Sequence, residues 1–197
     1  LDVGERNNLL ENGAEWEEKN GRKVNAIRLY YRAGAYEKIF KMPHTSYDLS
    51  DIEDENTRNM IFDILNKTPR DVKLRYPESM VPLAFILFFI GENEKLAETI
   101  GEILELTKVC SLSDDRKNTI LGETELLISF TKYNDIAEMS RHHRRAYKLL
   151  GKKASLINIR STWSFGSPSV MCLYHSKPGF LAHELELMDE CMPYYYR

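Results

Sequence analysis

Histidines are the first side chains in this sequence that could do chemistry, and five are present among 197 residues. His142 and His143 are adjacent, and adjacent residues point apart on a helix, so a shared metal ion is not expected. His143 follows the spacing of an apolar helix face, which predicts a partly buried, hydrogen-bonded side chain. His175 precedes a Pro-Gly turn, where a histidine more often caps a helix end than binds a ligand.

The strongest concentration of charge is the segment RHHRRAYKLLGKK, residues 141–153. On a helix it forms a candidate basic patch for nucleic acid or for an acidic partner. The preferred interpretation is a solvated helix face with cations near the C-terminal end, where the helix dipole favours them. The candidate patch residues are Arg141, Arg144, Arg145 and Lys148.

The segment WSFGSPSVMCLYH, residues 163–175, is aromatic, contains Gly and Ser, and lacks helical periodicity. One interpretation is a packed helix connection whose aromatic rings fill space in the core. The other is a loop on a concave surface, where aromatic anchors bind a ligand or a partner. The candidate residues of such an effector or partner surface are Trp163, Phe165, Tyr174 and His175.

No motif for a metal or a cofactor is present. The segment GKK, residues 151–153, lacks the upstream glycine and the following hydroxyl residue of a phosphate-binding loop. Cys110, Cys172 and Cys191 are odd in number and far apart, which favours reduced thiols in the cytoplasm over a disulfide framework. We therefore assign no catalytic, cofactor-binding or metal-binding residue, and we expect no cofactor and no enzymatic activity.

Composition is that of a soluble globular protein, with 43% hydrophobic and 29% charged residues. The net charge of −3 gives no overall bias towards nucleic acid or anionic membranes. The longest apolar run, residues 81–90, is roughly half of the ~20 residues that a membrane span needs. It is therefore predicted to be a buried core helix, and no membrane partner is expected.

Apolar residues recur with helical spacing along most of the chain and predict about nine or ten helices, with no convincing strand. Residues 1–42 are predicted to form a helical hairpin and the start of a third helix, with breaks at Gly21 and Gly34. Trp16 and the nearby tyrosines are expected to fill the space between these helices. Successive pairs recur at about 35–40 residues, in the range of tetratricopeptide to HEAT repeats. The predicted fold class is all-α, an α/α superhelix of antiparallel, tetratricopeptide-like helix pairs.

Local signals predict the later helices. A helix is expected from Glu55 to Lys67, and Pro82 is compatible with the next long helix only in its first turn. Gly101, inside a predicted helix, suggests a close backbone approach to a neighbour. Asn134 is expected to cap the helix that Gly151 ends.

The whole chain, 1–197, is predicted to be a single helical-repeat domain. Residues 43–55 form an acidic connector, 56–151 the central helix pairs, and 152–197 an aperiodic loop with terminal helices. The first residue is not Met and the sequence ends on MPYYYR, so we expect a fragment of a longer protein. Apolar ends of such an array could also pair two copies as a homodimer.

The segment WEEKNGRKVNAIRLYYRAGAYEKIF, residues 16–40, resembles the helical segment that follows the ATPase and winged-helix modules in bacterial LuxR-type regulators of the MalT-like class. FGSPSVMCLYHSKPG, residues 165–179, and the terminal MPYYYR look like a block in the helical-repeat region of these regulators. The resemblance implies a non-catalytic module that senses a small-molecule or protein effector. It would relay that binding to ATPase and DNA-binding domains absent from this sequence, so DNA would be bound only through those domains.

Three other functions remain open. A generic tetratricopeptide-like scaffold would bind proteins without any link to transcription. A helical enzyme would need at least one of its histidines to converge with a second histidine or a carboxylate in one pocket. Direct nucleic-acid binding would use residues 141–153 and would depend steeply on salt. The histidines available to such an enzyme are His142, His143, His175 and His183.

Overall fold

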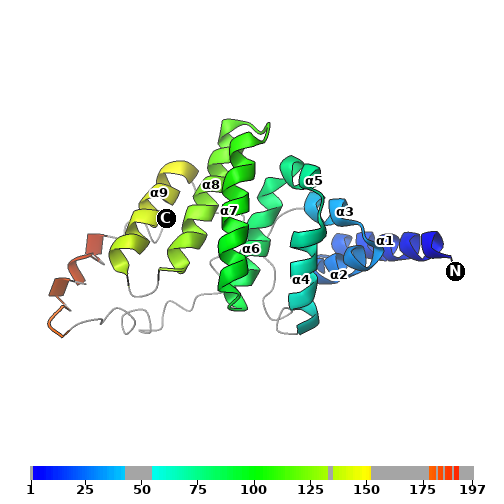
Figure 1. Cartoon of the computed structure of the whole chain (residues 1–197), viewed down its shortest axis with the longest axis horizontal. Helices are drawn as coiled ribbons and strands as arrows, with labels where there is room; N and C mark the ends of the chain where they lie inside the picture. The colour runs from blue at the N-terminus through cyan, green and yellow to red at the C-terminus, as the bar shows by residue number, and fades with distance from the viewer. Residues whose placement is uncertain are drawn as a thin grey trace. The chain divides into compact units, whose positions relative to one another are not determined.

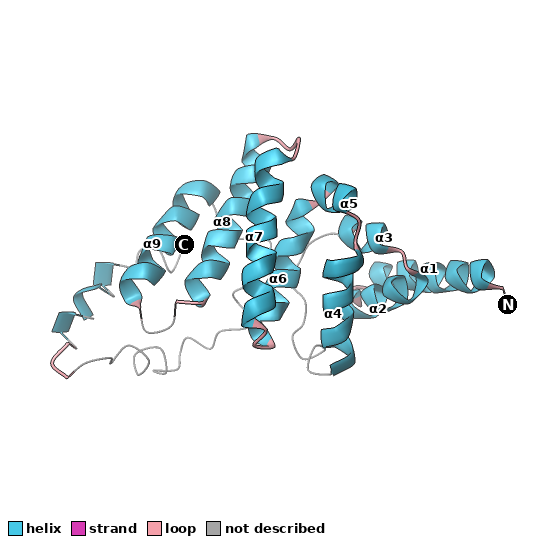
Figure 2. Cartoon of the chain, in the orientation of Figure 1, coloured by secondary structure: helices cyan, strands magenta, loops and turns pink. Residues whose placement is uncertain are grey.

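The regular elements of the described chain are all helical, which confirms the all-α class (Figure 2). A computed structural model describes residues 2–42, 55–132, 135–151, 178–180, 182–183, 185–187 and 189–190. The chain divides into two compact units, Leu1–Ser111 and Leu112–Arg197, called here the first and the second unit. The boundary lies inside the stretch 56–151 that the sequence pattern presents as continuous helix pairs.

The first unit contains seven α-helices and one short 3-10 helix among its described residues (Figure 1). They are α1 (Val3–Lys19), α2 (Lys23–Ala33), α3 (Tyr36–Lys41), α4 (Glu55–Lys67), α5 (Arg70–Arg75), η2 (Pro77–Ser79), α6 (Met80–Phe89) and α7 (Asn93–Val109). The second unit contains α8 (Asp114–Phe130) and α9 (Ile136–Leu150), and the described residues between 182 and 190 are also helical.

Helix ends follow the local signals of the sequence. Gly34 ends α2 in the left-handed region at φ 70°, as predicted. Helix α4 has the predicted bounds, and Pro82 is the third residue of α6, within its first turn. The prediction of an Asn134 cap is wrong by one residue. The cap of α9 is Asp135, whose carboxylate accepts the backbone N–H of Glu138 at 2.9 Å.

Helices of the first unit contact the next helix but one along the chain. Helix α2 contacts α4, and α4 contacts α6. In the same way α3 contacts α5, and α5 contacts α7. The even-numbered helices therefore follow one another in one row and the odd-numbered helices in a second row. The two rows can be followed by their labels in Figure 1.

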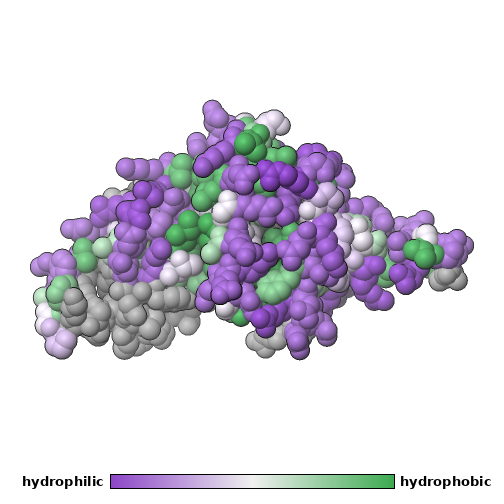
Figure 3. Space-filling view, in the orientation of Figure 1, coloured by the Kyte–Doolittle hydropathy of each residue, from purple (hydrophilic) through white to green (hydrophobic). Residues whose placement is uncertain are grey.

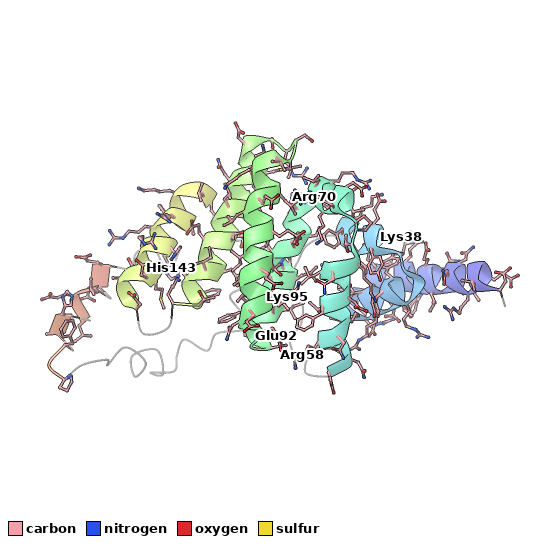
Figure 4. The ribbon with its side chains drawn as sticks, viewed as in Figure 1. Lys38, Arg58, Arg70, Glu92, Lys95 and His143 are labelled. Carbon is pink, nitrogen blue, oxygen red and sulfur yellow. The ribbon has the colours of Figure 1, made fainter. Side chains whose placement is uncertain are left out.

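Polar side chains join these next-but-one neighbours (Figure 4). Lys38 of α3 lies 2.8 Å from carboxylate oxygens of both Glu11 and Glu15 of α1, and this contact lowers the pKa of Glu15. Tyr31 of α2 donates a 2.5 Å hydrogen bond to Asp63 of α4. Further contacts of this kind are Arg28–Thr57, Arg75–Glu37, Arg70–Glu105 and Lys73–Glu102. Most of these contacts are partly buried, and only the pairs of Arg70 and Arg75 are exposed. The exposed pairs add little stability, so their main effect is to favour this pairing of helices.

The core of the first unit centres on α6, whose residues Met80 to Leu87 are all buried. Helix α6 packs chiefly on α7. Hydrophilic side chains cover most of the face of the first unit that Figure 3 shows. The prediction that this apolar run forms a core helix is confirmed. Among the described residues, no helix has both the length and the apolar character needed to cross a membrane.

Trp16 does not fill the space between helices, so this prediction is wrong. Its side chain is 57% exposed, and the guanidinium of Arg22 lies 4.5 Å from the ring centroid. The fully buried residue of α1 is Ala14, and Trp16 lies about 200° further round the helix. Ala14 and Ala26 allow α1 and α2 to approach closely, and Tyr30 is buried beside them as predicted.

The prediction of a close approach at Gly101 is wrong, and a close side-chain contact is found at another glycine instead. No heavy atom lies within 4 Å of a Cβ placed at Gly101. A Cβ placed at Gly122 of α8 would lie 2.6 Å from Cγ of Leu150 and 3.2 Å from Cβ of Leu149. The tight contact therefore joins α8 to the C-terminal turn of α9, where Gly122 leaves room for these leucines.

Candidate functional site

The candidate site lies on the pair of helices α8 and α9, which pack side by side within the second unit (Figure 1). Asp135 caps the start of α9, and Gly151 ends it at φ 58°. Between these caps, the buried face of α9 is unusually polar. It consists of Met139, Ser140, His142, His143 and Ala146.

His142 connects the two helices. Its side chain is 8% exposed, and its Nδ1 lies 2.5 Å from a carboxylate oxygen of Glu125 on α8. Because a carboxylate only accepts, Nδ1 carries the proton and donates it to this bond. The Nε2 atom lies 3.5 Å from Nη2 of Arg141 and 4.0 Å from Glu138. Both ring nitrogens of His142 are therefore in polar contact with side chains of the same helix pair.

The four basic residues singled out in the sequence lie on the exposed surface of α9, and we call them the α9 ridge: Arg141, Arg144, Arg145 and Lys148. Arg141 donates to Glu138, and this hydrogen bond lowers the pKa of the Glu138 carboxyl. Arg145 Nη1 lies 3.8 Å from Glu125, the carboxylate that His142 also contacts. Arg144 lies 3.3 Å from Glu190.

His143 follows His142 directly and belongs to the same buried face of α9. Its side chain is buried on α9 (Figure 4). Burial, with a smaller contribution from the charge of His142, lowers the pKa of His143 to about 4. His143 is therefore neutral at physiological pH, and its predicted burial is confirmed. Over the described residues, the predicted hydrogen bonds of its ring nitrogens are not found.

The chemistry open to this cluster is the binding of charge. Arginine and lysine donors of the α9 ridge face solvent, and their carboxylate neighbours fix the positions of the guanidinium groups. Over the described residues, no group of three His, Cys, Asp or Glu side chains is arranged to hold a metal ion. An exposed, positioned set of cations suits recognition of carboxylates or phosphates.

The remaining predicted residues have separate outcomes. The residues assigned to an effector surface lie outside the described part of the chain, so that assignment stays a prediction. They are Trp163, Phe165, Tyr174 and His175. His183 is 56% exposed, and its Nδ1 lies 4.0 Å from Glu186.

Sequence reasoning missed the carboxylates of the cluster. Glu138 could have been predicted, because a Glu three residues before Arg141 shares its helix face. Glu125 could not have been predicted, because it precedes His142 by 17 residues and meets it only through the packing of α8 on α9.

No protein-family model matches the chain, and neither a curated protein nor a solved structure gives a significant match.

Proposed function

We propose that this chain is a non-catalytic sensor and coupling module of a LuxR-type, MalT-like transcriptional regulator. The membership rests on the sequence blocks at 16–40 and 165–179, which resemble the helical region of such regulators. In this proposal the chain binds an effector or a partner protein. It passes the effect to ATPase and DNA-binding domains that this sequence does not contain.

The packing of next-but-one helices in the first unit is the observation that carries the binding role. Helical-repeat arrays consist of two rows of helices, as the first unit does, and such arrays present long open surfaces to their partners. The further step, that the rows continue as an α/α superhelix, belongs to the proposal. Helix lengths from 6 to 17 residues imply irregular rather than uniform repeats.

Coupling would work by a shift between two arrangements of the helix pairs. An effector that binds one arrangement more tightly raises its population, and no chemical step is needed. Typical coupling free energies are about 1–3 kcal/mol, or roughly a 5–150-fold change in affinity at the second site. The exposed contacts between next-but-one helices, Arg70–Glu105 and Arg75–Glu37, are individually weak, so rearranging them costs little.

A cytoplasmic location is part of the same proposal. It is supported by the odd number of cysteines and by Cys110, which is a free, buried thiol in the first unit. Small helical modules that act on transcription work where thiols stay reduced.

A thermal-shift screen tests the effector-binding role. The purified protein is heated with members of a metabolite library, each at roughly 100 times a plausible dissociation constant. A true effector adds about 2.7 kcal/mol to the unfolding free energy, which raises the melting temperature by about 5–10 °C. A library without any stabilising compound contradicts a small-molecule effector and leaves a protein effector as the form to test.

A second candidate function is a tetratricopeptide-like scaffold for proteins, unrelated to transcription. The observation that favours it is the same row packing, because helical arrays bind partners in many contexts without regulatory domains. The two functions differ in the domains that accompany the chain, and the complete reading frame separates them.

A further inference from the structure

The α9 ridge is more organised than a solvated row of charges. Arg141, Arg145 and Lys148 follow one another at i, i+4 and i+7, so they lie on one narrow stripe of α9. The stripe is about 10 Å long at the rise of an α-helix. The side chains of Arg141 and Arg145 are 45% and 53% exposed, so their donors are within reach of a partner.

Carboxylates from two helices hold this stripe in place. Glu138 binds Arg141 through both of its oxygens. Glu125 is itself fixed by the buried His142, and it attracts Arg145 from a distance of 3.8 Å. That distance exceeds a hydrogen bond, so the five N–H donors of Arg145 are not used up by Glu125. A guanidinium that is already positioned loses less conformational freedom when it binds a second carboxylate.

The length of the ridge favours a peptide over a nucleic acid. Duplex DNA carries one charge per about 1.7 Å, so it would extend well beyond a ~10 Å stripe. Its other phosphates would meet a chain of net charge −3, in which Glu125, Glu138 and Glu190 lie beside the ridge itself. A short acidic segment with two or three carboxylates matches the length of the stripe and does not extend over the rest of the acidic chain. Two of its carboxylates can pair with Arg141 and Arg145 in the two-bond geometry.

We infer that the α9 ridge binds a short acidic segment, rich in Asp or Glu, of a partner protein. This inference names the partner chemistry of the proposed binding module and rests on that function. The partner's carboxylates would add to or replace the exposed pairs that Arg141 and Arg145 already make. Such exposed pairs are individually weak, so exchanging them is not costly.

Fluorescence anisotropy with a fluorescein-labelled hexaglutamate peptide tests the inference on the full chain. The probe is expected to bind, and to bind more weakly as salt is raised. The double variant Arg145→Glu, Lys148→Glu is expected to reduce its affinity by at least about tenfold. The matched control is Arg32→Glu, Lys108→Glu, which changes the net charge equally at exposed sites of the first unit. The control is expected to retain wild-type affinity to within about twofold.

Each other outcome overturns the inference. Absence of hexaglutamate binding, or equal loss in both double variants, shows that the ridge is no specific acidic-peptide site. A 20-base-pair duplex that binds more tightly than hexaglutamate at equal salt, and is lost in the ridge variant, assigns the ridge to nucleic acid instead. Circular dichroism of both variants checks that they fold. The peptide and duplex results do not change the outcome of the thermal-shift screen. A failure of the acidic-peptide inference can therefore be distinguished from a failure of the proposed function.

Discussion

The burial of His143 makes the stability of the second unit depend on pH. An exposed histidine titrates near pH 6.5, and in the folded chain burial lowers the pKa of His143 to about 4. Between these values the unfolded chain binds more protons, so the unfolding free energy falls as pH falls. The expected loss between pH 7 and pH 5 is about 2 kcal/mol, measured by urea unfolding at both values.

His143→Phe is expected to remove most of this pH dependence, because phenylalanine keeps an aromatic ring in the buried site and cannot bind a proton. His183→Phe is the matched control, since His183 is 56% exposed. The His183→Phe variant should show the same difference in unfolding free energy between pH 7 and pH 5 as the wild type. If His143→Phe shows the wild-type difference in unfolding free energy between pH 7 and pH 5, His143 is not buried in a neutral state.

Trp16 and Phe40 are expected to differ strongly as core residues, although both are large aromatics. Phe40 is fully buried and Trp16 is 57% exposed. Phe40→Ala is expected to cost about 3–5 kcal/mol of unfolding free energy, and Trp16→Ala under about 1 kcal/mol. Thermal unfolding of the two variants checks this. A cost at Trp16 equal to that at Phe40 would mean that the indole packs in the core after all.

At the scale of the helices, Gly122 is expected to control how closely α8 and α9 pack. Gly122→Ala places a Cβ 2.6 Å from Cγ of Leu150, so leucine side chains or the helices themselves must move. The expected cost is about 1–3 kcal/mol, measured by thermal or urea unfolding.

Gly101→Ala is the matched substitution in α7, where a Cβ meets no atom within 4 Å. Without a clash, alanine has the better helix propensity and is expected to add about 0.5–1 kcal/mol. The pair separates packing from propensity. If both substitutions stabilise the chain, α8 and α9 are not in the tight contact described.

Helix ends were predictable because their causes are local. Gly34 and Gly151 each occupy a left-handed position that ends a helix, and Pro82 is tolerated only in a first turn. These signals act over a few residues, so they can be read without knowing any partner helix. The cap at Asp135 was missed by one residue because Asn134 and Asp135 have equivalent capping chemistry.

Contacts between helices were not predictable in the same way. Apolar spacing put Trp16 on a buried face, whereas the close approach of α1 and α2 is decided by Ala14 and Ala26. The pairing of Glu125 with His142 joins two helices across 17 residues, and no periodicity within either helix specifies it. Of the candidate site, sequence reasoning therefore identified the cations of the α9 ridge and none of the carboxylates that hold them, although helical spacing could have pointed to Glu138.

At the scale of the molecule, the first unit is expected to fold without the second. It is compact by itself and has its own buried helix, α6, packed on α7. A fragment of residues 1–111 should therefore show helical circular dichroism and cooperative thermal unfolding.

A fragment of residues 1–92 is the control, since it lacks α7 and uncovers part of the apolar surface of α6. It is expected to aggregate or to unfold without cooperativity. Equal cooperativity in both fragments would show that α7 is not part of the core of the first unit.

Membership in a LuxR-type regulator is tested most directly by determining the complete reading frame that encodes this chain. The predicted result is a phosphate-binding loop of the GxxxxGK[ST] type upstream and a helix-turn-helix segment downstream. A reading frame that encodes neither contradicts the assignment to a transcriptional regulator.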